Sequence, residues 1–261
     1  MTMTVDRSAF MEAALSLALR AGETIMTIYE TDFDVEIKGD SSPVTQADVA
    51  AEKIILDGLR HSFPSLPIVA EEEAAAGRLP ETGEQFVLVD PLDGTREFTS
   101  RNGAFTVNVA LIENGVPVAG IVHAPALNRT FGGVLGRGAF EVKEGARKVI
   151  KVRASNPEMI VAVASRSHLD DDTKAFLEKC GAKEKVSIGS SLKFCLLAAG
   201  EADVYPRFGR TMEWDTAAGH AVLNAAGGSV SKPDGTPFIY GKRNQAHDID
   251  FANGAFVARG G

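Results

Sequence analysis

Cysteine and basic residues are scarce in this chain, and both scarcities restrict what it can do. The two cysteines, Cys180 and Cys195, form neither a C-x-x-C pair nor a cysteine–histidine cluster with zinc spacing, so we expect two reduced, buried thiols. Lysine and arginine number 27 against 35 aspartates and glutamates, which gives a net charge of −8. Because binding a nucleic-acid polymer requires a surplus or a stripe of basic side chains, we do not expect such a partner.

Long apolar runs are also missing. No stretch of the 261 residues reaches the roughly 18 apolar residues that a membrane span requires. Charges at Asp6, Arg7, Glu12 and Arg20 interrupt the N-terminal region, which favours an amphipathic helix over a signal peptide. We therefore expect a cytoplasmic protein without a transmembrane segment, while peripheral membrane association and the oligomeric state stay open. Hydrophobic residues make up 44% of the chain, which is enough to bury a core.

The first half of the chain combines two predicted helices with a series of strands. Apolar residues recur every three or four positions over residues 8–29 and again over residues 45–63, which predicts a helix in each range. Strands are predicted at 66–70, 86–89, 104–112, 116–122, 130–135, 140–142 and 149–152. The turn at Asn114-Gly115 predicts an antiparallel hairpin between the strands on either side of it.

In the second half, strands alternate with helices, which is typical of an α/β lobe. The predicted strands are 159–164, 185–188 and 203–205, and the predicted helices are about 170–180, 190–200 and 215–226. We therefore expect a fold of mixed α+β and α/β class with two lobes. Residues 1–150 would form the α+β lobe, and residues 151–261 would form the α/β lobe.

The segment VDPLDGTREF, residues 89–98, carries the clearest chemical signal. An apolar strand ends at Asp90, a proline stiffens the following turn, and Asp93 returns three residues later. The two carboxylates and the carbonyl of Leu92 can therefore converge on one point. Carboxylates together with a backbone oxygen are the ligands of a hard divalent cation such as Mg²⁺.

Two further acidic groups follow a predicted strand or open a predicted helix. Glu71 and Glu72 come directly after the first predicted strand, and Asp215 stands at the start of an alanine-rich helix. Taken alone, Glu71–Glu73 fits a solvated loop, Asp215 fits a helix N-cap, and residues 90–95 fit a turn. Together they place acidic side chains where open α/β folds bind ligands, and a cation would offset their mutual repulsion. A metal site is therefore the simplest explanation.

Two threonines, Thr95 and Thr45, stand at the starts of predicted helices near the acidic groups. A short helix beginning at Gly94 and Thr95 would offer its first N–H groups to an anion. Thr45 and Asp48 have the spacing of a capping box at the start of the second predicted helix. Asp48 has two compatible interpretations, helix capping and proton relay, and capping is the better one from the local sequence.

The three acidic motifs resemble those of the inositol monophosphatase superfamily of Mg²⁺-dependent, lithium-sensitive phosphatases. The family pattern has a glutamate pair after a strand, then Asp-Pro-(Leu/Ile)-Asp-Gly-Thr, then Trp-Asp opening a late helix. All three occur here in order, as VAEEE, DPLDGT and EWDTAAGHA, and the likeness covers nearly the full length. The chain is similar to the 3′(2′),5′-bisphosphate nucleotidase branch, the CysQ type, in the segments 42–48, 93–98, 101–112, 165–168, 188–203, 205–209 and 214–223.

The resemblance implies a layered αβαβα sugar-phosphatase fold and an Mg²⁺-dependent phosphomonoester hydrolase. It implies that adenosine 3′,5′-bisphosphate is converted to AMP and phosphate. The implied ligands of two or three Mg²⁺ ions are Glu71, Asp90, the Leu92 carbonyl, Asp93 and Asp215. Most of these ligands belong to the first lobe, whereas the last ligand and the substrate contacts belong to the second.

The resemblance assigns catalysis to Thr95, Asp48 and Glu71, with Glu72 in support. Asp48 would pair with the Thr95 hydroxyl, and Thr95 would help to remove a proton from the attacking water. We expect in-line attack by a metal-activated water, with no covalent phosphoenzyme.

The second phosphate of a bisphosphate requires cations of its own. The implied substrate contacts are Gly94, Thr95, His168, Ser190, Lys193 and Arg207. From local sequence alone, Lys193 fits a solvated helix position and Arg207 a surface salt bridge, so both assignments depend on the resemblance. Glu73 departs from the family pattern, which has aspartate or serine there, and we expect it to be a surface residue.

Three other functions can be weighed against the sequence. An inositol or sugar monophosphatase would use the same metal site and leave Lys193 and Arg207 incidental. A non-catalytic nucleotide or metal sensor is disfavoured because the acidic motifs and Thr95 are all present. A calcium-stabilised structural protein would need an EF-hand-like loop, which is absent.

Overall fold

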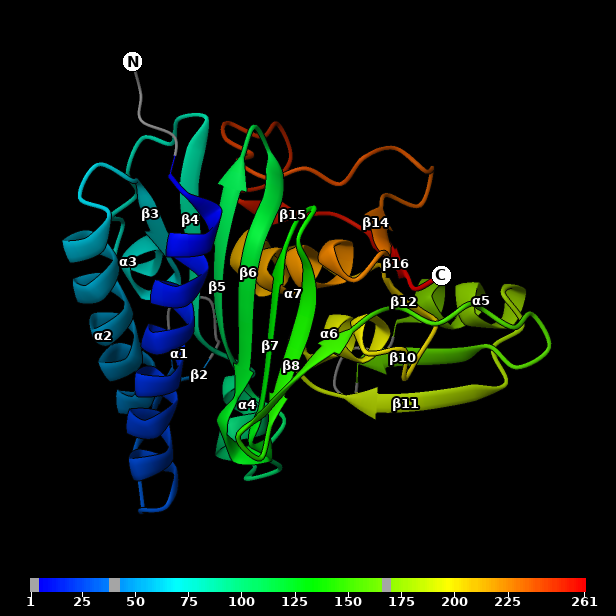
Figure 1. The fold of residues 1–261 in the computed structure, drawn as a ribbon, viewed down its shortest axis with the longest axis horizontal. Coiled ribbons are helices and arrows are strands. Elements are labelled where there is room, and N and C mark those ends of the chain that lie inside the picture. Colours follow the sequence, from blue (N-terminus) through cyan, green and yellow to red (C-terminus); the bar gives the residue numbers. More distant parts are fainter. Residues whose placement is uncertain (1–4, 38–42, 166–169) are drawn as a thin grey trace.

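Two β-sheets with helices outside and between them make up the fold (Figure 1). The structure is a computed structural model that describes residues 5–37, 43–165 and 170–261. Helices α1 (Arg7–Tyr29) and α2 (Gln46–Ser62) pack on one face of the larger sheet. Helices α6 (Leu192–Ala198) and α7 (Glu213–Ala225) lie between the sheets, and α5 (Asp171–Lys179) covers the outer face of the smaller sheet. The predicted layered αβαβα arrangement is therefore confirmed.

The larger sheet has seven strands, and all its neighbours are antiparallel except the first pair, which is parallel. In spatial order the strands are β3 (Ile68–Ala70), β4 (Gln85–Asp93), β5 (Thr106–Glu113), β6 (Val116–Ala124), β7 (Arg129–Val134), β8 (Gly138–Lys143) and β9 (Ala146–Ile150). The predicted hairpin is confirmed as β5 and β6. Its turn residues Asn114 and Gly115 both have positive φ, 49° and 77°, which asparagine and glycine tolerate best.

The smaller sheet has five strands and mixes parallel with antiparallel neighbours. In spatial order they are β11 (Glu184–Ile188), β10 (Val161–Ser165), β12 (Val204–Arg207), β16 (Phe256–Arg259) and β14 (Ser229–Ser231). Two short pairs complete the strands that the structure describes: β1 (Val35–Ile37) with β2 (Pro43–Thr45), and β13 (Thr211–Met212) with β15 (Ala252–Asn253). In the smaller sheet, β14 and β16 were not predicted from the sequence, although β16 joins β12 to β14.

The two-lobe division at residue 150 stays a prediction. The larger sheet ends at Ile150, and the smaller sheet lies entirely after it. Helix α7, which belongs to the second part of the chain, nevertheless packs on β4 to β7 of the larger sheet. Within the described ranges, no helix has both the length and the apolar composition needed to cross a membrane.

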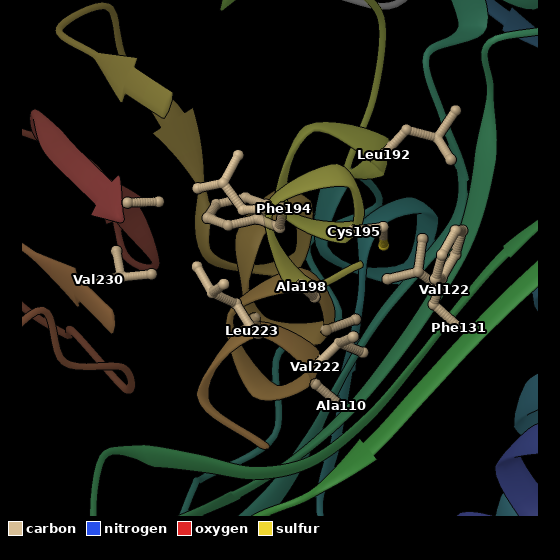
Figure 2. Close-up of a cluster of buried hydrophobic side chains, with 14 of the residues drawn as sticks. Ala110, Val122, Phe131, Leu192, Phe194, Cys195, Ala198, Val222, Leu223 and Val230 are labelled. Atoms are coloured by element: carbon tan, nitrogen blue, oxygen red, sulfur yellow. The ribbon is translucent and has the colours of Figure 1, made fainter. Parts of the chain in front are cut away.

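A buried cluster between the two sheets fixes α6 and α7. Figure 2 shows Phe194 and Cys195 of α6, Val222 of α7, Phe131 of the larger sheet and Val230 of the smaller sheet in this cluster. Burial of Cys195 confirms the prediction for that thiol, whereas Cys180 is only partly buried. Because side chains from both sheets and both helices interlock here, the position of α7 is set by the core.

Two glycines allow α7 to approach the larger sheet closely. A Cβ added at Gly120 would lie 2.7 Å from the carbonyl oxygen of Ala218, and one added at Gly133 would lie 2.8 Å from the Cβ of Ala225. Neither distance is compatible with normal van der Waals contact, so larger residues on the sheet would push the helix away. The alanines of α7 and the glycines of the sheet are therefore matched.

His123 is a buried histidine of β6. It is 7% exposed, and its Nδ1 lies 2.8 Å from the Oγ1 of Thr130. Its ring packs so close to Gly22 of α1 that an added Cβ would be 2.4 Å from Nε2. Burial lowers the pKa of His123 from 6.5 to about 4, so the ring is neutral in the folded protein at neutral pH.

We expect His123→Gln to reduce the loss of stability in acid. The pKa of His123 is lower in the folded protein than in the unfolded chain, so the unfolded chain is protonated at a higher pH. The free energy of unfolding therefore falls as the pH decreases from 6.5 to about 4. Urea unfolding at about pH 7 and about pH 5 should show a loss about 2 kcal/mol smaller in the variant than in the unsubstituted protein. Exposed His61→Gln is the control and should leave the loss unchanged. An equal loss in His123→Gln and the unsubstituted protein would contradict the prediction.

Candidate active site

A β-bulge at the end of β4 brings the two aspartates of the central motif to one face of the sheet. Asp90 pairs with Asn108 of β5 and Asp93 pairs with Thr106, so β4 advances three residues while β5 advances two. In a regular strand, residues three apart point to opposite faces, and one extra residue corrects this. Leu92 N–H then donates to Asp90 Oδ1 at 3.0 Å. The predicted convergence of the two carboxylates therefore depends on an irregularity in the strand.

Two helix beginnings supply the other acidic side chains. Glu71 is the first residue of α3 (Glu71–Ala75), directly after β3, so the solvated-loop interpretation is wrong. Asp215 is the third residue of α7 and accepts a hydrogen bond from Met212 N–H at 2.8 Å. Because Asp215 lies inside the helix, it is not the N-cap residue, and the N-cap interpretation is wrong. Its carboxylate nevertheless stabilises the first turn of α7, as an N-cap side chain would, by accepting from Met212 N–H.

The acidic side chains perturb one another strongly. Burial is the largest cause that raises the pKa of Asp90 well above its usual range, followed by the charges of Glu71, Asp93 and Asp215 and a hydrogen bond with Glu71. The pKa of Asp215 is likewise raised well above its usual range, by burial first and then by the charge of Asp93. The pKa of Asp93 is raised by burial too, while Lys193 opposes the shift. Four carboxylates from three segments, α3, β4 and α7, therefore repel each other inside the protein.

This donor set fits a hard divalent cation chemically, because buried carboxylate oxygens are the preferred ligands of such ions. In the described part of the chain, no three Asp, Glu, His or Cys side chains are already gathered as a metal cluster. Each aspartate instead has an oxygen bonded to a backbone N–H, and these N–H groups belong to Leu92, Ser191 and Met212. The fit therefore rests on the chemistry and the mutual repulsion of the carboxylates.

Asp48 links helix capping to the central motif. Its Oδ2 accepts from the N–H and the hydroxyl of Thr45 at 2.8 and 2.7 Å, which forms the predicted capping box of α2. Its Oδ1 accepts from the Thr95 hydroxyl at 3.2 Å, which also lies 3.4 Å from the Leu92 carbonyl. Asp48 is 1% exposed. The same carboxylate therefore stabilises α2 and orients Thr95, so the capping interpretation is confirmed, whereas the proton relay stays a prediction.

Ser191 and Asn108 tie the two halves of the site together, and the sequence analysis missed both. Ser191 N–H donates to Asp93 Oδ2 at 2.6 Å, and the Ser191 hydroxyl donates to the Asp215 carbonyl at 2.5 Å. The Asn108 side-chain amide donates to Asp93 at 3.2 Å and to the Ser191 hydroxyl at 3.1 Å. The available signals were the position of Ser191 inside the SSLKFC segment, next to the chosen Ser190, and that of Asn108 inside the segment 101–112.

A pocket of about 300 Å³ opens beside these groups. Of the residues expected in the site, it is lined by Glu71, Asp93, Gly94, Thr95, Ser190, Lys193, Arg207 and Asp215. Arg96 and Arg210 line it as well, so the pocket combines acidic and basic side chains. Asp48, Asp90 and Leu92 are buried and do not line it. His168 lies outside the described residues.

Two of the basic residues that line the pocket, Lys193 and Arg207, donate to backbone carbonyls, whereas Arg210 pairs with Asp248. Lys193 is 6% exposed, and its Nζ donates to the carbonyl of Ser190 at 2.6 Å. Burial lowers the pKa of Lys193 to about 8, and the charge of Asp93 opposes that shift. Arg207 donates from Nε to the Gly209 carbonyl at 3.0 Å and from Nη2 to the Arg210 carbonyl at 3.3 Å. The solvated-helix interpretation of Lys193 is therefore wrong.

Glu73 is not the simple surface residue that the sequence analysis expected. Its side chain is 16% exposed and accepts from Arg60 Nη2 at 2.6 Å, with Arg78 Nε at 3.8 Å. Arg60 belongs to α2, so this ion pair ties α3 to α2. Glu73, where the chain departs from the family pattern, therefore helps to hold α3, the helix that begins at Glu71.

Known proteins resemble this chain both in sequence and in fold. A model described as the inositol monophosphatase family matches residues 6–253. A relative from Shigella flexneri named 3′(2′),5′-bisphosphate nucleotidase CysQ is 46% identical over 235 residues, which is 89% of this chain and 94% of the relative. The crystal structure of CysQ from Bacteroides thetaiotaomicron has a TM-score of 0.80 and 38% identity over 97% of both chains. The structure of a Thermotoga maritima IMPase has a TM-score of 0.77 and 30% identity over 95% of this chain and 91% of that one.

Removing one charge from the acidic cluster should stabilise the protein when no divalent cation is present. Asp215→Asn keeps an oxygen that can accept from Met212 N–H but removes a negative charge that is buried beside other carboxylates. We expect the free energy of unfolding in chelator near neutral pH to rise by about 1 kcal/mol. Adding Mg²⁺ should then stabilise the variant less than the unsubstituted protein. Urea unfolding with chelator and with Mg²⁺ measures both effects, and a less stable variant in chelator would contradict the prediction.

Proposed function

The chain belongs to the inositol monophosphatase family, and we propose that it is a metal-dependent 3′(2′),5′-bisphosphate nucleotidase of the CysQ type. The observation that carries this conclusion is 46% identity to a relative of that name over 89% of the chain. A further relative of the same name, from Salmonella typhimurium, is 47% identical over the same share. The substrate we propose is adenosine 3′,5′-bisphosphate, which would be hydrolysed to AMP and phosphate.

For the metal, the proposed ion is Mg²⁺, with two or three ions per site. The proposed ligands are Glu71, Asp90, the Leu92 carbonyl, Asp93 and Asp215, and the support is the mutual repulsion of the acidic side chains. When bound, the ions would supply neutralisation of phosphoryl charge and acidification of a water molecule. Glu72, next to Glu71 in the first turn of α3, is proposed as a supporting residue.

For catalysis, the proposed residues are Thr95, Asp48 and Glu71. The Thr95 hydroxyl donates its hydrogen to Asp48, so its oxygen lone pairs face the pocket as acceptors for a water proton. Asp48 cannot turn away, because its other oxygen is bonded to both Thr45 groups. Thr95 thus orients the attacking water, and Asp48 stands ready to take up the proton that Thr95 passes on.

For the substrate, Gly94 and Thr95 are proposed to receive the scissile phosphate. Gly94 has φ of 96°, and a Cβ there would lie 3.3 Å from the Ala104 carbonyl, so the tight path needs glycine. His168, Ser190, Lys193 and Arg207 are proposed contacts of the nucleotide and its second phosphate. The buried Lys193 also holds the Ser190 carbonyl, which supports a role in shaping the pocket wall.

The location we propose is the cytoplasm. The two cysteines are free and therefore compatible with a reducing compartment. The substrate class is a soluble nucleotide, which needs no membrane partner.

Phosphate release should distinguish this substrate from the runner-up class. With Mg²⁺, we expect kcat/KM for adenosine 3′,5′-bisphosphate to exceed that for inositol 1-phosphate by about a hundredfold, because the second phosphate adds charge-assisted hydrogen bonds. Arg207→Ala should reduce this ratio, mainly through KM for the bisphosphate. The reverse preference would identify an inositol or sugar monophosphatase instead. No phosphate release from either substrate would leave a nucleotide or metal sensor.

The Thr95 hydroxyl should be required for turnover and not for folding. Thr95→Val removes the hydroxyl at nearly constant volume, and we expect kcat to fall by about a hundredfold or more while the melting temperature stays close to the original value. Thr95→Ser restores the hydroxyl and should restore most of the activity. Thr99→Val, on the same short helix α4 (Thr95–Thr99), is the matched control. Full activity of Thr95→Val would exclude Thr95 from the proton path.

A further inference from the structure

Glu52 is a buried carboxylate of α2 that belongs to none of the acidic motifs. It is 5% exposed. Its Oε2 accepts from Glu72 N–H at 2.8 Å, and its Oε1 accepts from Glu73 N–H at 3.0 Å. Both oxygens are thus bonded to consecutive amides of the first turn of α3, the turn that begins at Glu71.

Helix α3 depends on this contact because it cannot hold its own first turn. It has five residues, Glu71–Ala75, and an isolated helix of that length is not stable. The preceding residue, Ala70, has no side-chain oxygen and makes no side-chain cap. Glu52 therefore supplies, from another helix, the acceptor that an N-cap serine or aspartate would normally supply.

Helix α2 thereby connects two parts of the site. Asp48 and Glu52 are four residues apart on this helix and so lie on one face. Asp48 bonds the Thr95 hydroxyl, whereas Glu52 bonds the segment that carries Glu71. One rigid helix thus sets the position of Thr95 relative to Glu71.

Keeping a carboxylate at this position has an energetic cost. The pKa of Glu52 is raised to about 7, mainly by burial and also by the charges of Glu72 and Glu73, while the two backbone hydrogen bonds oppose the shift. A glutamine would avoid the cost of a buried charge but would offer only one acceptor oxygen, so its NH₂ group would face one of the two N–H donors. The carboxylate is therefore the side chain that can bond both amides.

We propose that Glu52 is a positioning residue of the reaction: by bonding the N–H groups of Glu72 and Glu73 it fixes the first turn of α3 and so directs Glu71 toward Asp90. This inference rests on the proposed function, because Glu71 matters only if the acidic cluster binds Mg²⁺. The side chain of Glu52 itself does not line the pocket. It acts only through the backbone of α3.

The test uses the full chain with Glu52→Gln and Glu52→Asp. Glutamine removes the charge and one acceptor, whereas aspartate keeps the charge but is one methylene too short to reach both amides. The first measurement is the Mg²⁺ concentration that gives half of the maximal shift in melting temperature without substrate. The second is the Mg²⁺ concentration for half-maximal phosphate release, followed by KM at saturating Mg²⁺.

We expect both variants to need about tenfold more Mg²⁺ in both measurements, because groups that orient a metal ligand usually change affinity by this order. KM for the nucleotide at saturating Mg²⁺ should change less than twofold. Asp57→Asn is the matched control, an exposed carboxylate on the same helix, and should behave as the unsubstituted protein. If Glu52→Gln does not fold, the Mg²⁺ requirement of Glu52→Asp tests the proposal on its own.

Three outcomes would overturn the proposal. Unchanged Mg²⁺ requirements together with a lower melting temperature in chelator would reduce Glu52 to a structural cap. If Glu52→Asp has a normal Mg²⁺ requirement and Glu52→Gln does not, the charge of Glu52 matters and its hydrogen bonds to both amides of α3 do not. If the unsubstituted protein neither responds to Mg²⁺ nor releases phosphate, the proposed function itself fails, and that pattern is distinct from the other two.

Discussion

The mutual repulsion of buried carboxylates is the constraint on which the site depends. Burial raises the pKa values of Asp90, Asp93 and Asp215, and the charges of Glu71 and of Asp93 raise those of Asp90 and Asp215 further. Side chains that repel each other would turn away unless something held them. Each aspartate is bonded to a backbone N–H, and those amides belong to the β4 bulge, the loop before α6 and the start of α7. The fold therefore supplies the rigidity that keeps an unfavourable charge arrangement in place.

That rigidity comes from parts of the chain far from the motifs. Helix α7 can carry Asp215 into the site only because its alanines meet glycines such as Gly120 on the larger sheet. Ser191 then bonds Asp93 from the larger sheet and the carbonyl of Asp215 from α7. The buried cluster around Phe194 holds α6 and α7 between the sheets. A substitution in these contacts would move a carboxylate without touching it.

The sequence predicted what local patterns encode and missed what depends on distant partners. Helix and hairpin periodicity and the capping box at Thr45 are local, and the structure has all of them. The turn interpretation of residues 90–95 is wrong, because β4 continues through the bulge to Asp93. Glu52 carries no local signal and Ser191 has only its place in the SSLKFC segment, since each acts through a bond to a segment at least 20 residues away. Strand β16 is four residues long, and its place between β12 and β14 is set by the sheet. Glu73 was misjudged for the same reason, because its partner Arg60 lies on another helix.

Asp48 shows why stability and activity are coupled in this fold. One of its oxygens belongs to the capping box of α2 and the other to the Thr95 hydroxyl. A looser cap would release the N-terminal turn of α2 and with it the orientation of Thr95. Farther along α2, Glu52 and Arg60 hold the two sides of α3. Asp48 and Glu52 lie on the same buried face of α2 as Ile55, Leu56 and Leu59, so the hydrophobic burial of this face against α1 and the larger sheet also holds the polar contacts in register. The precision of the polar site is thus a property of the apolar core beneath it.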